Sequence, residues 1–327
     1  MGIFRAARLL LTALVLAIAV APAVAKADEY PTKPIRLIIP GPPGGSTDLL
    51  GRLVAAKLAD RLGQPIVVDN RPGANGVVGA LALESFPADG YTLELTVYPA
   101  ELINPLIMAK PPYDPIRDFA PISTLSVSPL VLVVGNSVPV KSLKDFLAYA
   151  KAQPGKVNYG SSGVGSADQL AVELMSYNNG IKLNHVPYKG SAPLLVDLIG
   201  GRIQMRMGSV LTNLGAIRAN QVKPLAIDSQ TRDPLIPDVP TFTEAGIAPL
   251  DVKVMFGIVG RAGTPQPVID KLSAAINQTL TMPGVQKFVS DNGGQTLIST
   301  PAEFAKIIEH DQEKYGKVVK AANIKIN

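Results

Sequence analysis

Residues 35–48 read Ile35-Arg36-Leu37-Ile38-Ile39-Pro40-Gly41-Pro42-Pro43-Gly44-Gly45-Ser46-Thr47-Asp48, and the expected architecture of the chain can be worked out from them. The apolar run predicts a buried strand, and the prolines and glycines after it predict a loop. A helix should follow, because apolar residues recur on one helical face, at Leu50, Leu53, Val54, Leu58 and Leu62. We expect Ser46, Thr47 or Asp48 to cap this helix.

This loop has the properties of an anion-binding site. The start of a helix leaves backbone N–H groups without partners and carries the positive end of the helix dipole. Gly44 and Gly45 have no Cβ, so a ligand can approach the backbone there. Residues 43–48 are therefore predicted to bind a carboxylate or a phosphate.

The same pattern recurs in the second half of the sequence. A short strand, Val157-Asn158-Tyr159, precedes a glycine–serine loop, and an apolar helix follows. The two helix starts share Gly-Ser-x-Asp-x-Leu, at residues 45–50 and 165–170. Each alone could be an ordinary strand-to-helix turn with good caps. Two together favour a cleft with one anion-binding helix end on each wall, the second made by Ser161, Ser162, Val164, Gly165 and Ser166.

The first 25 residues are typical of an export signal. Arg5 and Arg8 supply a positive start to the apolar run Leu9–Val20. Ala23-Val24-Ala25 is a small-x-small cleavage site. An uncleaved membrane anchor is the alternative, although the apolar run is short for a membrane span. The chain has no cysteine, which excludes a lipid-anchored lipoprotein, disulfides and thiolate metal sites. We therefore expect a soluble protein outside the cytoplasm.

Length and charge limit the classes of function. The 327 residues suffice for about two domains, and an apolar content of 47% is ample for a core. Two of the charges in the net charge of +5 belong to the signal, and no Lys/Arg cluster or set of stacking aromatic residues is present. Nucleic acid is therefore not an expected partner.

Strand and helix patterns alternate along the rest of the chain. Strands are expected at residues 64–68, 91–97, 130–134, 183–188, 203–207, 223–227 and 252–259. Such alternation predicts an α/β fold with mostly parallel sheets flanked by helices. Ligands of these sheets bind beyond the carboxyl ends of the strands, where Tyr98 stands. A tyrosine of a surface loop is the alternative for Tyr98.

We expect two lobes. Residues 33–125 and 128–250 repeat the same alternation, and the apolar strand at 252–259 is placed to cross back to the first lobe. The final helices should pack on that lobe, which makes it discontinuous. We predict a signal at residues 1–25, lobe 1 at 26–126 plus 252–327, and lobe 2 at 127–251. The candidate hinges are residues 126–128 and 249–252.

Seven short motifs stand in order along the chain: Tyr30-Pro31-Thr32-Lys33-Pro34-Ile35, Pro43-Gly44-Gly45-Ser46-Thr47-Asp48, Asn70-Arg71-Pro72-Gly73-Ala74, Asp89-Gly90-Tyr91-Thr92-Leu93, Tyr113-Asp114-Pro115-Ile116-Arg117-Asp118-Phe119-Ala120-Pro121, Val186-Pro187-Tyr188-Lys189-Gly190 and Pro237-Asp238-Val239-Pro240-Thr241. The ordered set resembles the Bug-type receptors of tripartite tricarboxylate transport systems. The resemblance implies a two-lobed periplasmic binding protein (Venus flytrap, type II-like) that closes on a small carboxylate ligand. It implies that both glycine loops contact the ligand carboxyl groups and that membrane transporter subunits are the partners. We expect a monomer.

Several positions depart from the pattern of that family. Arg206 stands where an apolar residue is usual, and Gln204 and Gly208 stand where aspartates are usual. Without a carboxylate at Gly208, a ligand amine would lack its counter-charge. If Arg206 faces the cleft, it could bind a second carboxylate in a fork geometry; a solvated arginine at the edge of a lobe is the alternative. The expected ligand is a dicarboxylate or an aromatic acid rather than an amino acid.

Residues for other chemistry are sparse. His185 and His310 lie in different segments without metal-ligand spacing, and His185 fits a packing role at a strand end. No G-x-S-x-G elbow surrounds the loop serines, and the first loop lacks the Gly-Lys-Ser/Thr of a P-loop. Asp48 and Asp168 fit helix capping better than a pair of catalytic acids. We therefore predict no catalytic residue, no metal and no cofactor.

Three classes of function stay open. A transport receptor predicts saturable binding without turnover. A ligand sensor would act on a histidine-kinase ectodomain instead. A secreted hydrolase predicts turnover that substitution of Ser46 or Ser166 abolishes. The receptor is favoured, because a cleft between two helix ends needs no catalytic base.

Overall fold

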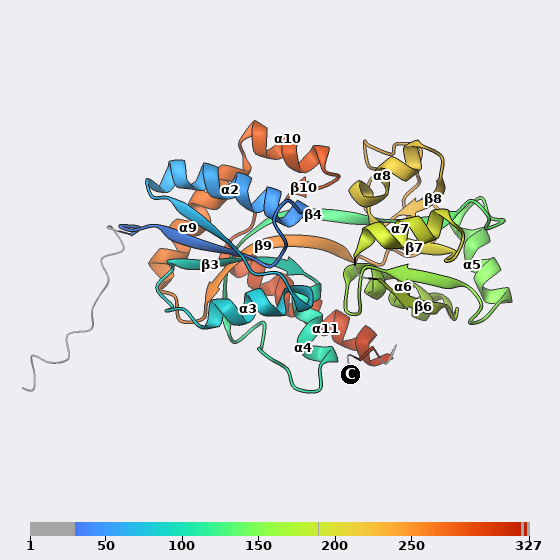
Figure 1. Cartoon of the computed structure of the whole chain (residues 1–327), viewed down its shortest axis with the longest axis horizontal. Coiled ribbons are helices and arrows are strands. Elements are labelled where there is room, and N and C mark those ends of the chain that lie inside the picture. Colours follow the sequence, from blue (N-terminus) through green and yellow to red (C-terminus); the bar gives the residue numbers. More distant parts are fainter. Residues whose placement is uncertain (1–29, 189, 322–323, 326–327) are drawn as a thin grey trace, which may run out of the picture.

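The predicted strand–loop–helix at residues 35–48 is present as strand β1 (Ile35–Ile39) and helix α2 (Ser46–Leu62) (Figure 1). The computed structural model describes residues 30–188, 190–321 and 324–325, so the predicted signal at 1–25 lies outside the described residues. The predicted side-chain cap of α2 is wrong. The N-cap residue is Gly45, which has no side chain to accept a bond, and the Asp48 carboxylate accepts a hydrogen bond from the backbone N–H of Gly44.

The other elements follow in chain order. The strands are β2 (Ile66–Asn70), β3 (Thr92–Tyr98), β4 (Phe119–Gly135), β5 (Asn158–Ser161), β6 (Asn184–Pro187), β7 (Met205–Ser209), β8 (Val222–Ile227), β9 (Lys253–Arg261) and β10 (Gln295–Thr296). The helices are η2 (Ala74–Gly76, a 3₁₀ turn), α3 (Val77–Glu84), α4 (Ala100–Ile107), α5 (Leu143–Ala152), α6 (Ala167–Asn179), α7 (Ser191–Ile199), α8 (Val210–Arg218), α9 (Gln266–Leu280), α10 (Pro283–Asp291) and α11 (Pro301–Ala321).

The strands form two sheet regions joined by two long strands, in the order β2-β1-β3-β9-β4-β7-β5-β6, with β8 and β10 also paired to β4. In the first lobe β1, β2 and β3 are parallel, and β9 runs antiparallel to β3 and β4. In the second lobe β5, β6 and β7 are parallel, and β7 and β8 run antiparallel to β4. In the first lobe β9 and the short β10 therefore run opposite to the other strands, and in the second lobe β4 does. Strands β4 and β9 both cross between the lobes (Figure 1).

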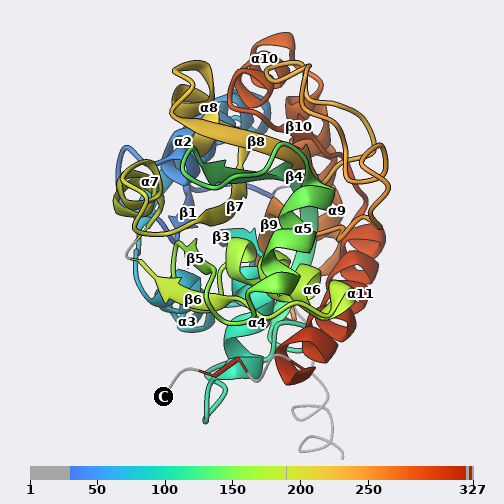
Figure 2. The same ribbon diagram turned by 90° about the vertical axis from the view of Figure 1, so that its right-hand side faces the viewer.

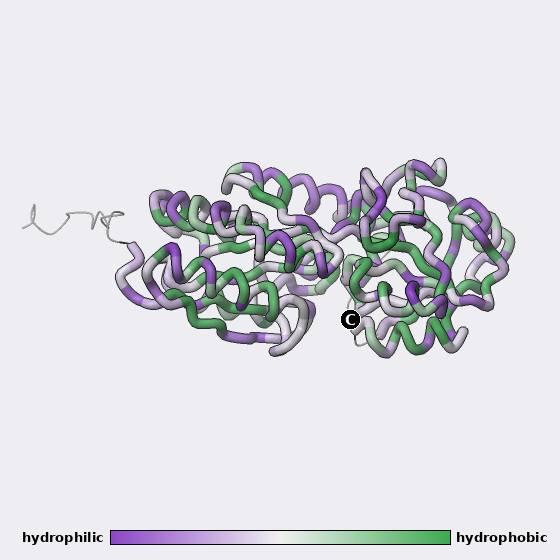
Figure 3. The backbone as a smooth tube through the Cα atoms, turned by 90° about the horizontal axis from the view of Figure 1, so that it is seen from above, coloured by the Kyte–Doolittle hydropathy of each residue, from purple (hydrophilic) through white to green (hydrophobic). Residues whose placement is uncertain are grey.

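Each lobe has helices on both faces of its sheet. Along β1, Leu37 and Ile39 pack in the core made with α2 and α9, whereas Ile38 packs in the core made with α3 and α4. Along β4, Leu132 packs with the α5 and α6 side, and Val133 with the α7 and α8 side. This period of two is what a strand covered on both faces requires. Figure 2 shows the helices around the second-lobe sheet, and Figure 3 shows how apolar segments concentrate inside both lobes.

Two predictions about the connections need correction. Residues 126–128 are not a linker but part of β4, where Ser126, Val127 and Ser128 pair with β9. The partner strand supplies the hydrogen bonds that a serine-rich segment would otherwise take from water. Helix α11 was expected on the first lobe alone, but it contacts both α4 and α6 and so packs against both lobes. Helices α4 and α10 were not predicted.

Candidate functional site

A cavity of about 360 Å³ lies between the lobes. It is lined from the first lobe by Pro40, Gly41, Pro42, Thr47, Asn75, Gly76, Val97, Tyr98, Pro99 and Ala100, from the crossing strands by Leu130 and Val254, and from the second lobe by Ser162, Ser166, Ala167, Asp168, Ser191, Arg206, Gly208, Ser209 and Thr212. These residues stand at the ends of strands and the starts of helices. A ligand in this cavity would contact both lobes at once.

Six helices begin at the cavity wall. Thr47 lies in the first turn of α2, Gly76 is the N-cap residue of α3, Ala100 begins α4, Ala167 begins α6, Ser191 begins α7, and Ser209 is the N-cap residue of α8. Each start carries the positive end of a helix dipole and backbone N–H groups without intrahelical partners. Their convergence makes the cavity favourable for an anion.

Asp48 holds the first glycine loop in place. Its side chain is 2% exposed, and its carboxylate accepts hydrogen bonds of 2.9 Å from Gly44 N–H, Arg52 Nε and Asn70 Nδ2. The bonds from Arg52 and the Gly44 amide lower the pKa of Asp48 to about 2, so the group is ionised at neutral pH. Because this carboxylate takes the Gly44 amide, that amide is not free for a ligand.

The second loop is built in a similar way. The Asp168 carboxylate accepts bonds from the Ser162 amide at 2.7 Å and from its hydroxyl at 2.9 Å. The Gly165 amide donates to Gln169 Oε1 at 2.8 Å. Asp48 and Asp168 thus bond the loops in front of their own helices, and they do not act as a pair of catalytic acids.

The predicted site residues divide into two groups. Those that line the cavity are Thr47, Tyr98, Ser162, Ser166, Arg206 and Gly208. Those that lie behind or beside its wall are Pro43, Gly44, Gly45, Asp48, Ser161, Val164 and Gly165. Ser46 begins α2. The amides of Gly44, Gly45 and Gly165 are engaged inside their loops, and a ligand role for these residues stays a prediction.

Tyr98 is not the surface-loop residue that was considered as its alternative. It is 2% exposed, and its ring meets Phe304 of α11 edge-on, with centroids 5.8 Å apart. It therefore lies between the cavity and the core of the first lobe.

Sequence reasoning missed several lining residues. Asn75 and Gly76 follow β2, and Ser191 and Ser209 start helices α7 and α8 after strands β6 and β7. The available signal was the general rule that ligands bind beyond the carboxyl ends of parallel strands. Applied to every strand, that rule would have included these four residues.

Arg206 lies on β7 and is 1% exposed, so the alternative of a solvated arginine at a lobe edge is wrong. Its Nη2 donates to Ser191 Oγ at 3.2 Å, and its Nε lies 3.4 Å from the carbonyl oxygen of Met207. Its Nη1 has no hydrogen-bond partner among the residues that the structure describes. Burial lowers the pKa of Arg206, but an arginine stays protonated across physiological pH.

A serine–histidine pair lies beside the second loop. Ser161 Oγ is 2.6 Å from His185 Nε2, and Gln169 Nε2 is 3.3 Å from His185 Nδ1. Ser161 is fully buried and does not line the cavity, and no carboxylate among the described residues bonds the imidazole. His185 stacks on Tyr159 with ring centroids 4.8 Å apart, which agrees with the predicted packing role. Burial lowers the pKa of His185 and keeps the ring neutral.

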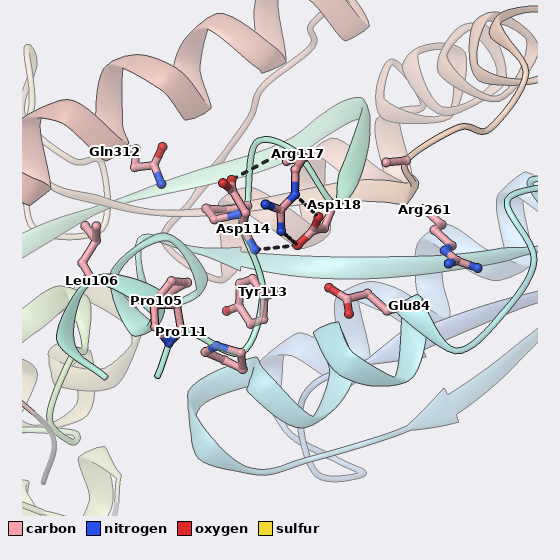
Figure 4. A pocket seen from close by; sticks show the side chains of 13 residues that line it. Glu84, Pro105, Leu106, Pro111, Tyr113, Asp114, Arg117, Asp118, Arg261 and Gln312 are labelled. Carbon is pink, nitrogen blue, oxygen red and sulfur yellow. Dashed lines mark hydrogen bonds and ion pairs between the residues drawn. The ribbon is translucent and has the colours of Figure 1, made fainter. Parts of the chain in front are cut away.

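A larger cavity, of about 690 Å³, lies on the first lobe near α4 and α11 (Figure 4). None of the predicted site residues lines it. Arg117 is paired with Asp118 at 2.8 Å, and Arg261 donates to the carbonyl oxygen of Phe86 at 2.7 Å. The carboxyl group of Glu84 also faces this cavity (Figure 4). With its cations already engaged, this cavity does not suit a carboxylate.

The described parts of the chain offer neither a metal site nor a membrane-spanning helix. No group of three or more His, Asp or Glu side chains there could hold a metal ion. None of the helices in those parts is both long and apolar enough to span a bilayer.

A family model described as the tripartite tricarboxylate transporter family receptor matches residues 50–324. The chain belongs to this receptor family. BugT of Bordetella pertussis is 37% identical over 301 residues, which are 92% of each chain. The resemblance to Bug-type receptors is thereby confirmed. The family consists of receptors rather than enzymes, which agrees with the prediction of no enzymatic activity.

Solved structures similar to this receptor share its fold. A protein of R. palustris solved with adipate has a TM-score of 0.79 and 32% identity, and covers 90% of this chain and 99% of its own. MatC of Rhodopseudomonas palustris, solved with bound malate, has a TM-score of 0.76 and 29% identity, and covers 89% of this chain and 100% of its own. The predicted two-lobed periplasmic binding protein fold is thus confirmed.

Proposed function

We propose that this receptor binds a small carboxylate, a dicarboxylate or an aromatic acid, in the cavity between its lobes and delivers it to the membrane subunits of a tripartite tricarboxylate-type transporter. The observation that carries the proposal is the convergence of six helix starts on one cavity. Two similar proteins were solved with the dicarboxylates adipate and malate, which supports the same ligand chemistry here.

The proposed binding sequence uses both lobes. A carboxylate first meets the helix starts of one lobe, and the other lobe then closes over it and excludes water. Removal of water lowers the local dielectric constant and strengthens each N–H···O⁻ contact. We propose lobe boundaries near residues 126 and 252, where β4 and β9 pass between the lobes.

A binding experiment tests the ligand class. We expect succinate or terephthalate to bind the purified receptor in isothermal titration calorimetry and to raise its melting temperature. Succinamide, which has a similar length and no charge, should do neither. Tight binding of aspartate with no binding of either diacid would overturn the proposal, because an amino acid needs a counter-charge for its amine.

Export and delivery need separate tests. We expect the periplasmic protein to begin at Lys26 and to be monomeric, which intact-mass measurement and light scattering would determine. Uptake of labelled ligand into proteoliposomes that hold the transporter subunits should require the receptor. Uptake that proceeds equally without it would contradict delivery and favour the sensor role.

A further inference from the structure

Arg206 carries a buried charge that no ion pair neutralises. None of the ion pairs among the described residues includes it. The acidic group whose charge acts on it is Asp168, and Ser162 already bonds both oxygens of that carboxylate. A buried cation with a free donor is strongly unfavourable unless an anion arrives to pair with it.

The guanidinium is directed along β7 toward the cavity. A Cβ atom added to Gly208 would lie 2.4 Å from Arg206 Nη2, so the guanidinium lies over residue 208. Strand β7 ends at Ser209, which lines the cavity, and Ser191 Oγ holds Nη2 from the start of α7. The charge is therefore held at the second-lobe wall of the cavity.

Gly208 and Arg206 function as a pair. Any side chain at position 208 would occupy the space that the guanidinium fills. Val131 and Val133 of β4 pair with Gly208 and Arg206 in the sheet. Their apolar side chains cannot hydrogen-bond the guanidinium. The glycine thus makes room for the arginine, and the arginine gives the second-lobe wall a fixed positive charge.

We infer that Arg206 is a specificity-determining residue that binds the second anionic group of a doubly charged ligand. The first carboxylate then lies at the helix starts of the first lobe. This inference rests on the proposed function. It predicts that the receptor prefers dianions to aromatic acids that carry one carboxylate. A forked guanidinium matches the two oxygens of a carboxylate, which a point charge does not.

The experiment compares a diacid with its own half-ester. Succinate, glutarate and adipate are titrated into the receptor beside their monomethyl esters, which keep the chain and lose one charge. We expect the best diacid to bind about 10- to 100-fold more tightly than its half-ester. In Arg206→Met this preference should vanish through weaker diacid binding, with the half-ester unchanged. Gly208→Ala should have the same effect, because its methyl group displaces the guanidinium.

Arg202→Met is the matched control, because the Arg202 side chain is exposed and paired with Asp197 on the surface of the same lobe. It removes an equal charge and should keep the preference. If Arg206→Met does not fold, Arg206→Lys retains the charge without the fork and should lose part of the preference. Equal binding of diacid and half-ester by the wild type, or an undiminished preference in the Arg206 and Gly208 variants, overturns the inference. Failure of every acid to bind instead overturns the proposed function.

Discussion

The Nδ2 amide of Asn75 donates a hydrogen bond of 2.8 Å to the carbonyl oxygen of Val164, which joins the first lobe to the second beside the cavity. The Nδ2 amide of Asn104 in α4 donates a hydrogen bond of 2.9 Å to the carbonyl oxygen of Asn75. Asn75 has a left-handed backbone with φ of 50°, which asparagine tolerates better than most residues. The contact therefore connects the loop after β2 with the loop before α6.

Removal of this bond should make the closed form easier to open. We expect Asn75→Gly, which keeps the backbone freedom, to weaken ligand binding about 2- to 10-fold, mainly through faster dissociation. Stopped-flow dissociation measurements test this. Asn220→Gly is the control, because Asn220 is also exposed and left-handed, with φ of 53°, but lies within the second lobe. Equal dissociation rates in the wild type and Asn75→Gly would contradict a cross-lobe role.

Gly165 permits close approach of the two lobes. It has φ of +82°, and a Cβ atom there would lie 2.7 Å from Ile107 Cδ1 of α4. Gly165→Ala should therefore hinder closure and reduce ligand affinity by at least about tenfold, as measured by calorimetry. Gly180→Ala separates backbone strain from the clash, because Gly180 has φ of +60° with no atom near its Cβ position.

Gly45 should behave differently, although the same loop pattern surrounds it. Its backbone is not left-handed, and its Cβ would lie 3.3 Å from the carbonyl oxygen of Pro42 within the same loop. We expect Gly45→Ala to leave the affinity within about threefold of the wild type. An affinity loss as large as that of Gly165→Ala would contradict this expectation. It would indicate that the ligand lies nearer the first loop than the lining of the cavity suggests.

Asp48 should stabilise the first loop through its charge. Asp48→Asn is expected to cost about 2 kcal/mol of unfolding free energy at pH 7, because the bonds from Arg52 and Gly44 lose a charged acceptor. The folded pKa of about 2 lies below the unfolded value, so the contribution is present above about pH 4 and is lost as the pH falls through 2. Urea unfolding at pH 7 and pH 3 measures this. Asp60→Asn, at an exposed position of the same helix, is the control, and an equal loss there would contradict the special role of Asp48.

Two buried glutamates should make the fold more stable in mild acid. Glu94 is fully buried with no partner for either oxygen among the described residues, and Glu101 bonds Thr96 and the Val97 amide. Burial raises the pKa of Glu101 to about 8, and burial together with the Glu101 charge raises the pKa of Glu94. The folded state then binds protons that the unfolded chain releases above about pH 4.5.

Stability is therefore expected to fall as the pH rises from about 4.5 through 8, with a slope of up to about 1.4 kcal/mol per pH unit for each proton. Melting temperatures between pH 5 and 8.5 measure this slope. Glu101→Gln should flatten it, whereas Glu309→Gln at an exposed site of α11 should not. A wild-type stability that rises with pH over this range would contradict the assignment.

Features fixed by neighbouring residues were predictable from the sequence. Ser142 is a cap-type residue directly before the helix, and it caps α5 by accepting a bond from the Asp145 amide. Thr300 and Glu303 have the Thr-x-x-Glu spacing of a capping box, and they form one at the start of α11. Both glycine loops lie between the expected strand and helix. In each case the residues that determine the structure lie within a few positions of one another.

Features fixed by distant residues were not predictable. No strand was predicted at Thr124, yet it lies in β4 and is fully buried, because its hydroxyl bonds Leu297 and Ser299 from a segment far along the chain. The orientation of Arg206 could not be predicted either. The alternation of residues 203–207 indicates a strand, but it does not show that the guanidinium packs over Gly208.

The paired strands β4 and β9 determine how the molecule can move. They form a continuous hydrogen-bonded ribbon between the lobes, with register irregularities between Pro121 and Ser123 and between Thr124 and Ser126. Such irregularities bend a strand and increase its local twist. We expect a ribbon of this kind to resist twisting elastically. The lobes should then return toward one resting angle after the ligand leaves.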